Sequence, residues 1–199
     1  DWGILVTRTD PTVRKHKGLT FFFLDRKSPF GEIRPIKQIS GDRNFNEVFF
    51  TDLRIPDSQR LGQPGEGWKV SLTTLMNERL AVGESPGPDF DEVFQLAREI
   101  EFEDGPAIRN AAVREKLAEW YVQGQGLKYT RFRTMTALSR GQTPGPEASI
   151  GKVVHAKRLQ DMASFGIELM ETAGPVMERE GMPFGKLLQH AYMFAPGMR

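Results

Sequence analysis

One continuous stretch decides how this chain is interpreted: Asn46-Glu-Val-Phe-Phe-Thr-Asp-Leu-Arg-Ile-Pro56, Leu61-Gly-Gln-Pro-Gly-Glu-Gly-Trp68 and Leu75-Met-Asn-Glu-Arg-Leu-Ala-Val-Gly83. Its first part has the β-branched and aromatic residues typical of a strand. Its second part is a glycine-rich bend, and its third part predicts a helix. Within that helix Glu78 has apolar residues one turn away on either side. A carboxylate on a partly apolar helix face can lose solvent, which raises its pKa toward the range useful for a general base. An ordinary exposed or ion-paired glutamate fits the same spacing.

Arg79 follows Glu78 directly. Adjacent residues diverge on a helix, so the two side chains do not share a face. The Arg79 guanidinium is instead a candidate for holding an anionic or carbonyl group near Glu78.

The residues before the bend predict strands. Short segments rich in β-branched and aromatic residues, separated by turn formers, cover 2–8, 19–24, 32–36 and 47–51. Four or five strands in so short a stretch predict an antiparallel sheet or part of a barrel.

The residues after the bend predict helices. The first begins near Trp68 and ends at Ser85-Pro-Gly-Pro88, and Asp89 is placed to cap a second one. Longer helices are expected over 107–140, despite Gly124 and Gly126, and over about 147–172, the chain breaking at 142–146 between them. Strands first and helices afterwards indicate an α+β, multi-domain chain: an antiparallel β-barrel or sheet segment over 1–66, then an up-down helical bundle over 67–199.

Composition excludes several classes of protein. The 199 residues carry a net charge of +1, which gives no general attraction to nucleic acid or membrane. The absence of cysteine from this sequence excludes disulfides, thiolate catalysis and cysteine metal sites in it. No apolar run approaches the roughly 18 residues that a membrane span needs. The sequence starts at Asp1 with no methionine and no signal-peptide pattern, so we expect a piece of a longer protein.

The remaining polar residues carry weaker predictions. His16, His155 and His190 lie far apart, without metal-ligand spacing, and the basic run at 14–17 is expected to be a solvated loop. Cationic side chains on the long helices are expected to be solvated or to lie at a subunit interface: Arg131, Arg133, Arg140, Lys152, Lys157 and Arg158.

The opening stretch resembles the acyl-CoA dehydrogenase family where its middle β-domain meets its C-terminal helical domain. The family signature, F/V-F-x-D-x-R-V/I-P, then L-G, then G-x-G-W/F, matches residues 48–56, 61–62 and 65–68. Residues 1–10 and 17–25 are similar to paired strands of the middle domain. Residues 146–152 are similar to the start of a bundle helix in bacterial members. The resemblance covers essentially the whole chain and implies the second half of the β-domain plus most of the helical domain.

The resemblance implies a flavin enzyme. In the family, FAD accepts a hydride from Cβ of a CoA thioester while a glutamate removes the Cα proton, leaving a trans-2-enoyl-CoA. Some members carry this glutamate near the C-terminus; others, including isovaleryl- and long-chain-type enzymes, carry it in an E-R pair in the first helix of the C-terminal domain. Glu78-Arg79 stands at the second location, which implies that Glu78 is the catalytic base. The implied acyl-CoA contacts are His16, Met76, Asn77, Glu78 and Arg79.

The resemblance also implies partners. Family members share FAD across a subunit interface, so a homotetramer or dimer of dimers is expected. An electron-transfer flavoprotein is the expected electron acceptor, and a bacterial-type member is expected in the cytoplasm.

Two flavin motifs of the family are altered here. Arg98 aligns with the arginine of an R-x-x-F-G motif that reaches a neighbouring subunit's FAD, but residues 99–103 read Glu-Ile-Glu-Phe-Glu. A Q-x-x-G-G-x-G segment has become Glu171-Thr-Ala-Gly-Pro175, in which Gly174 is retained. Arg98 and Gly174 are therefore the implied FAD contacts. The family's late glutamate would lie beyond residue 199. These departures leave two alternatives: an oxidase or flavin monooxygenase on the same scaffold, and a non-catalytic subunit of a heteromeric acyl-CoA dehydrogenase.

Overall fold

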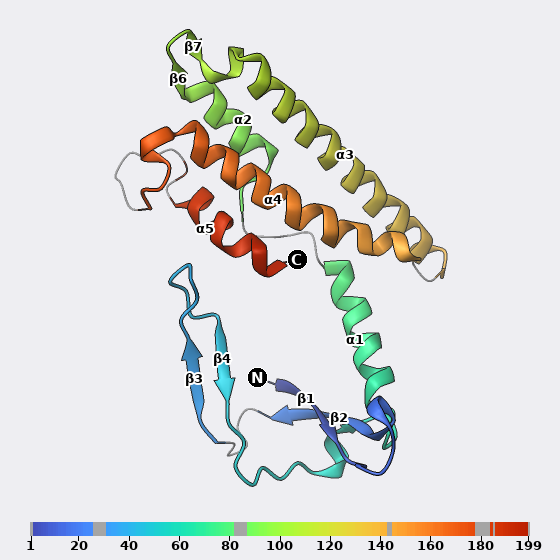
Figure 1. The fold of residues 1–199 in the computed structure, drawn as a ribbon. Helices are drawn as coiled ribbons and strands as arrows, with labels where there is room; N and C mark the ends of the chain where they lie inside the picture. Colours follow the sequence, from blue (N-terminus) through green and yellow to red (C-terminus); the bar gives the residue numbers. More distant parts are fainter. Residues whose placement is uncertain are drawn as a thin grey trace. The chain divides into compact units, whose positions relative to one another are not determined.

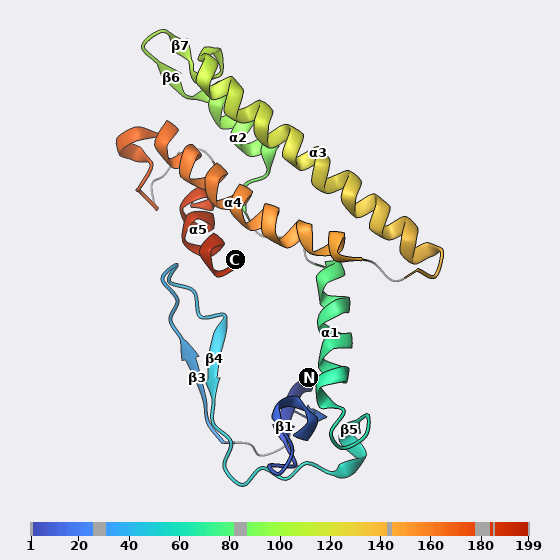
Figure 2. The same ribbon diagram turned by 45° about the vertical axis from the view of Figure 1, so that its right-hand side comes forward.

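The computed structural model describes residues 2–25, 31–81, 87–142, 145–177, 184 and 186–198, with the backbone alone for residues 78–81 and 148. Residues 28–30 belong to the turn formers Ser28-Pro29-Phe-Gly31, which mark an expected turn between two strands, and they lie outside the described residues. So do the predicted breaks at Ser85 and Pro86 and at Thr143 and Pro144. Internal contacts divide the chain into two compact units, Asp1–Glu78 and Arg79–Arg199. Figures 1 and 2 show the elements of each unit, which are described separately below.

The first unit contains two small antiparallel sheets. One has the order β1 (Trp2–Arg8), β2 (Leu19–Asp25) and β5 (Arg60–Leu61). Strand β2 supplies the buried side chains, with Phe21 only 2% exposed. The other sheet pairs β3 (Ile33–Ile36) with β4 (Phe45–Val48). The predicted antiparallel strands at 2–8, 19–24 and 32–36 are confirmed.

The predicted strand at 47–51 is wrong in its bounds. The ladder ends where Ile33 pairs with Val48, because the partner strand starts there. Beyond it, Phe49 N–H donates one more hydrogen bond to the Glu32 carbonyl, at 2.9 Å. Asp52 then has a φ of 48°, in the left-handed region, which no strand continues through.

The glycine-rich bend fixes the start of α1 (Gly67–Ala81) against β2. Gly65 has a φ of 86°, which favours glycine, and its N–H donates to the buried Thr20 hydroxyl at 3.2 Å. A Cβ at Gly67 would lie 2.7 Å from the Leu19 carbonyl carbon. The bend therefore needs glycine at 67 because β2 passes too close for a side chain.

The second unit is helical, with α2 (Phe90–Glu99), α3 (Ala111–Ser139), α4 (Ile150–Leu169) and α5 (Leu187–Phe194). Both views show α3 and α4 running beside each other, with α2 against α3 and α5 against α4 (Figures 1 and 2). Trp120 is buried and meets Phe165 edge-on, with ring centroids 5.0 Å apart. Around this pair the main core contains Val93, Leu96, Val113, Leu117, Met162, Leu169 and Leu188.

Local hydrogen bonds set the starts of the helices. Asp89 caps α2 as predicted: its carboxylate accepts from Phe90 N–H at 2.7 Å, and Glu92 accepts from Asp89 N–H at 2.9 Å. The helix predicted over 107–140 begins later, at Ala111, because the Asn110 side chain accepts from Ala112 N–H and caps it there. Gly124 and Gly126 do not interrupt it.

The helix predicted over about 147–172 is shorter than expected. The 3-10 turn η4 (Pro146–Ser149) precedes it and η5 (Glu171–Ala173) follows it. Glu171 has a φ of 49°, which is incompatible with a continuing α-helix.

Several elements were not predicted from the sequence. They include strand β5, the hairpin of β6 (Glu101–Phe102) and β7 (Gly105–Pro106), helix α5, and the 3-10 turns η1 (Lys15–Gly18), η2 (Asp57–Gln59), η3 (Ala107–Arg109) and η6 (Ala195–Met198). In the described part of the chain, no helix has the length and apolar character needed to cross a membrane.

Candidate functional site

The predicted substrate residue His16 lies in η1 and stacks on Trp68, in the first turn of α1. The ring centroids are 5.5 Å apart and the ring planes make an angle of 27°. Both side chains remain exposed. The structure thus brings a loop residue of the β-unit against the helix that carries the other predicted substrate contacts.

The basic loop around His16 has a defined shape. Arg8 donates to the Lys15 carbonyl at 2.7 Å, and Thr9 N–H donates to the Gly18 carbonyl at 2.9 Å. A Cβ at Gly18 would lie 2.1 Å from the Asp10 carbonyl oxygen, so the loop closes on itself at this glycine. The side chains of residues 14–17 are exposed, as predicted.

The remaining predicted substrate residues lie near the end of α1. Met76 is exposed, and Asn77 donates its amide to the Thr73 carbonyl at 2.9 Å. Glu78 and Arg79 belong to the same helix by their backbone, and their side chains are outside the described part. At 1.5 Å per residue, Glu78 follows Trp68 by about 15 Å along the helix axis. Helix α1 therefore carries both Trp68, on which His16 stacks, and the predicted base Glu78.

Arg98 lies in the last turn of α2 and is exposed. The β6–β7 hairpin follows it, and Gly105 in this hairpin has a φ of 110°. Phe102 is turned toward the main core. Four exposed carboxylates follow the arginine closely in the sequence: Glu99, Glu101, Glu103 and Asp104. An exposed guanidinium fits a phosphate group, but these neighbours repel one, so the fit of this corner to the diphosphate of FAD is incomplete.

Gly174 has a packing reason to be glycine. A Cβ there would lie 2.1 Å from the Ile167 carbonyl oxygen at the end of α4. Its own carbonyl accepts a 2.6 Å hydrogen bond from the buried side chain of Gln189 on α5. Gly174 thus joins the ends of two helices within the second unit.

A polar cluster that the sequence did not reveal lies in a cleft of about 740 Å³ in the second unit. Arg158 on α4 was predicted to be solvated or at an interface, but its side chain is only 7% exposed and it donates to the Asp89 carboxylate at 3.0 Å. Gly124 makes the room, since a Cβ there would lie 3.2 Å from an Arg158 nitrogen. His155 faces the same pair, and its Nε2 is buried without a hydrogen-bond partner among the described residues.

The cluster shifts both of its titrating groups. Burial would raise the pKa of Asp89, but the hydrogen bonds from Phe90 N–H and from Arg158 outweigh it and lower that pKa below its usual value. Burial, with the Arg158 charge adding to it, lowers the pKa of His155, so the neutral imidazole is favoured in the folded protein.

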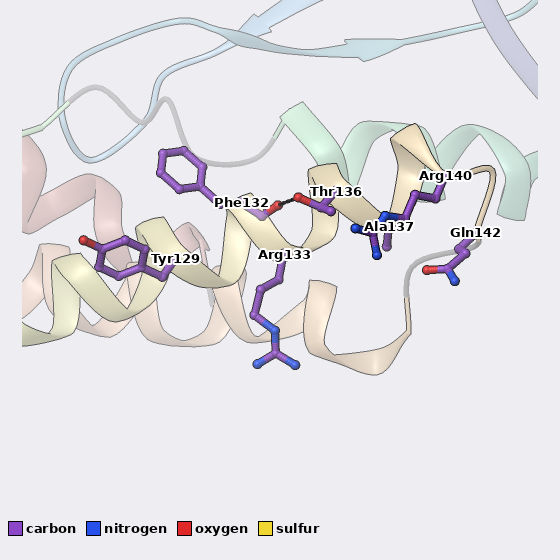
Figure 3. Close-up of a pocket in the computed structure, with 7 residues that line it drawn as sticks. All are labelled: Tyr129, Phe132, Arg133, Thr136, Ala137, Arg140 and Gln142. Carbon is purple, nitrogen blue, oxygen red and sulfur yellow. Dashed lines mark hydrogen bonds between the residues drawn. The ribbon is translucent and has the colours of Figure 1, made fainter.

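A second, shallower groove of about 390 Å³ lies along α3, on the part of the helix shown in Figure 3. It is lined by Tyr129, Phe132, Arg133, Thr136, Ala137, Arg140 and Gln142. Its cationic and aromatic side chains belong to one helix and the residues just after it.

Comparisons with known proteins match this chain to one family. The family model described as "Acyl-CoA dehydrogenase, C-terminal domain" matches residues 65–198. Acyl-CoA dehydrogenase FadE34 of Mycobacterium tuberculosis is 32% identical over 89% of this chain, and acyl-CoA dehydrogenase IpdE1 of Mycolicibacterium smegmatis is 30% identical over 89%. The chain spans 24% and 44% of the lengths of these two relatives.

Solved structures show the same fold. An acyl-CoA dehydrogenase from Geobacillus kaustophilus superposes with a TM-score of 0.84 at 20% identity, over 100% of this chain and 52% of that one. A structure titled "Tcur3481-Tcur3483 steroid ACAD" superposes with a TM-score of 0.82 at 21% identity, over 98% of this chain and 50% of that one. The expected α+β class is confirmed. The chain belongs to the acyl-CoA dehydrogenase family, a family of oxidoreductases.

Proposed function

We propose that the full-length protein carries out the FAD-dependent α,β-dehydrogenation of an acyl-CoA thioester to a trans-2-enoyl-CoA, with Glu78 as the base that removes the Cα proton. The observation that carries this proposal is the family match over residues 65–198, which starts in the glycine-rich bend and includes the Glu78-Arg79 pair in α1.

The first unit supports a role in holding the acyl-CoA. The exposed basic loop at 14–17 offers cations to phosphate groups, and His16 stacked on Trp68 offers an aromatic surface to a base. From there α1 leads past Met76 and Asn77 toward Glu78. Arg79 would hold the thioester carbonyl or another anionic group close to the base.

Glu78 would act as a carboxylate that accepts the Cα proton once the acyl-CoA covers the apolar side chains one turn before it. Loss of water from this part of α1 brings the carboxylate closer to the basicity that the step needs. The protein's part is thus to position the thioester and to accept one proton.

FAD, when bound, would supply the acceptor for the hydride from Cβ. Arg98, despite its acidic neighbours, and Gly174 are the proposed FAD contacts among the described residues. An electron-transfer flavoprotein is the proposed electron acceptor, and the assembly is proposed to be a tetramer.

A non-catalytic subunit of a heteromeric acyl-CoA dehydrogenase is the second candidate. The acidic hairpin beside Arg98 favours it, because four carboxylates weaken any diphosphate site there. The titles of two structural neighbours, "Tcur3481-Tcur3483 steroid ACAD" and the ChsE4-ChsE5 complex of Mycobacterium tuberculosis, name two components each.

The test uses the full-length protein with bound flavin. Glu78→Gln should abolish anaerobic flavin bleaching by straight-chain, branched and steroid-side-chain acyl-CoA thioesters, while flavin content stays as in the wild type. Glu47→Gln, on an exposed position of β4, is the matched control and should bleach normally. Normal bleaching by Glu78→Gln would show that another group is the base.

Two further measurements separate the alternatives. Protein purified alone with no flavin and no bleaching would indicate the non-catalytic subunit. Oxygen consumption that exceeds reduction of an artificial electron acceptor would indicate an oxidase or monooxygenase.

A further inference from the structure

The cleft of the second unit combines apolar walls with a polar buried side. Its volume of about 740 Å³ is typical of a site for a small molecule. Large apolar side chains on α3 form part of the walls, and Tyr121, Phe132 and Met135 are each about half exposed. Phe90, at the start of α2, meets the Tyr121 ring edge-on, with centroids 5.4 Å apart. Aromatic walls of this kind suit a ring-shaped apolar ligand, which would cover side chains that otherwise contact water.

Arg158, on the buried side of the cleft, has more hydrogen-bond donors than partners. A guanidinium carries five N–H groups. In the described part of the chain, Arg158 donates one hydrogen bond, to Asp89, and its Nε is buried without a partner. Buried polar groups without a partner are uncommon in folded proteins, so this nitrogen suits an acceptor from outside the chain.

His155 supplies a second polar atom on the same side of the cleft. It precedes Arg158 by three residues on α4, so the two side chains lie on one face of the helix. Its Nε2 is also buried without a partner among the described residues. Burial and the Arg158 charge lower the pKa of His155, so its imidazole is neutral at pH 7. A permanent donor and a neutral imidazole nitrogen therefore lie next to the same cleft.

The charges of the cleft favour a neutral ligand group. Arg158 is already paired with Asp89. The other charged residues that line the cleft are two cations and two carboxylates: Lys128, Arg131, Asp91 and Glu147. These charges balance. A ligand carboxylate on Arg158 would lie beside the Asp89 carboxylate, and like charges at close range repel each other.

Among neutral groups, a hydroxyl matches both nitrogens whichever ring nitrogen of His155 carries the proton. If Nε2 is unprotonated, a hydroxyl oxygen accepts from Arg158 while its own proton is donated to Nε2. If Nε2 is protonated, the same oxygen accepts from both side chains through its two lone pairs. A carbonyl oxygen fits only the second arrangement.

We propose that this cleft binds a molecule with a hydroxyl group on a compact, ring-shaped apolar body, the hydroxyl being held by Arg158 and His155. Both nitrogens lie beneath the cleft surface, so the ligand reaches them through a side-chain rotamer change of the kind common on binding. Every residue that lines the cleft belongs to the second unit, and none of them is a predicted acyl-CoA or FAD contact. The site therefore goes beyond the proposed function and does not depend on it.

The test uses menthol, a neutral alicyclic alcohol, as the probe. In the full-length protein without other cysteines, Met135→Cys places a thiol in the cleft wall, and its alkylation rate by iodoacetamide measures access to the cleft. Menthol should slow this reaction, whereas Tyr192→Cys, at an exposed position of α5 outside the cleft, should react at an unchanged rate. Menthane carboxylate, which carries an anion on the same ring, should need at least about tenfold more for half-protection, because of its repulsion by Asp89.

Arg158→Met, combined with Met135→Cys, tests the role of the guanidinium. It should raise the menthol concentration for half-protection at least about tenfold, as expected for the loss of a hydrogen bond to a charged group. Lys152→Met removes an exposed cation of α4 outside the cleft and should leave this concentration unchanged. Circular dichroism checks the fold of each variant.

Three results would each overturn the proposal. The first is alkylation of the Met135→Cys thiol at the same rate with and without menthol. The second is half-protection by menthane carboxylate at the same or a lower concentration than by menthol. The third is an unchanged half-protecting concentration of menthol in the folded Arg158→Met variant.

Discussion

The buried ion pair of the second unit predicts an asymmetry between its two partners. Arg158 is 7% exposed at its side chain, whereas the side chain of Asp89 is 76% exposed. Asp89→Asn keeps the cap of α2, because asparagine caps as well as aspartate, but leaves the buried guanidinium without a counter-charge. A hydrogen bond to a charged group contributes about 2 kcal/mol, so this variant should lose about 2 kcal/mol of unfolding free energy.

Arg158→Met should lose less than about 1 kcal/mol. Methionine keeps the apolar stem and removes the buried charge, and the exposed Asp89 carboxylate is solvated by water instead. The double variant should therefore be about as stable as Arg158→Met alone, so the coupling energy should equal the cost of Asp89→Asn, about 2 kcal/mol.

Urea unfolding of the full-length protein, followed through the fluorescence of Trp120 in a variant without the other tryptophans, measures this. Asp91→Asn, in the first turn of α2, is the matched control. It should cost no more than about 0.5 kcal/mol, since Asp91 lies near the helix N-terminus but the ion pair of the buried Arg158 is formed with Asp89. If Arg158→Met costs as much as Asp89→Asn or more, the buried charge is not what makes the pair asymmetric, and the reasoning fails.

Three further predictions follow from single residues. The pKa of His155 is lowered from its usual value of 6.5 in the folded protein, so near and below pH 6.5 the unfolded chain binds more protons than the folded one. The free energy of unfolding should therefore fall as the pH decreases from 6.5. His155→Asn should remove the contribution of this residue to the pH dependence of the thermal unfolding temperature. Gly67→Ala should lower the free energy of unfolding by about 1 kcal/mol or more, because the added Cβ overpacks the site against β2. Gly151→Ala, at a position on α4 where a Cβ meets no other atom, should be neutral or stabilising by up to about 1 kcal/mol in the same thermal assay. Asn110→Ala should cost about 1 kcal/mol in urea unfolding by removing the cap of α3, and Asn110→Asp should restore most of it.

Local patterns predicted the elements whose causes are local. Strand β1 was predicted because it is rich in β-branched and aromatic residues and is followed by turn formers. The start of α2 was predicted because Asp89 stands directly before the helix as its cap. Helix α5 was missed because its eight residues are too few to establish a period.

The polar cluster in the second unit was beyond sequence reasoning for a physical reason. Arg158 is buried only because Gly124 leaves space on a different helix and Asp89 supplies a charge from a third segment. The stacking of His16 on Trp68 likewise joins a loop to a distant helix. The residues adjacent to them in the sequence do not predict such contacts. The catalytic role of Glu78 stays a prediction, since the family resemblance rather than local chemistry carries it.

The hydrogen bond from Gly65 to Thr20, together with the close approach of Gly67 to β2, has a consequence for chimeric enzymes. The first turns of α1 belong by contact to the β-unit, and the division between the units falls after Glu78. A junction placed after residue 66 would join α1 of one parent to a β2 that never evolved against it. When helical domains are exchanged among relatives, the segment from β2 to Glu78 should therefore come from a single parent protein. The proposed base then remains in the same chain segment as the strand that fixes the start of its helix.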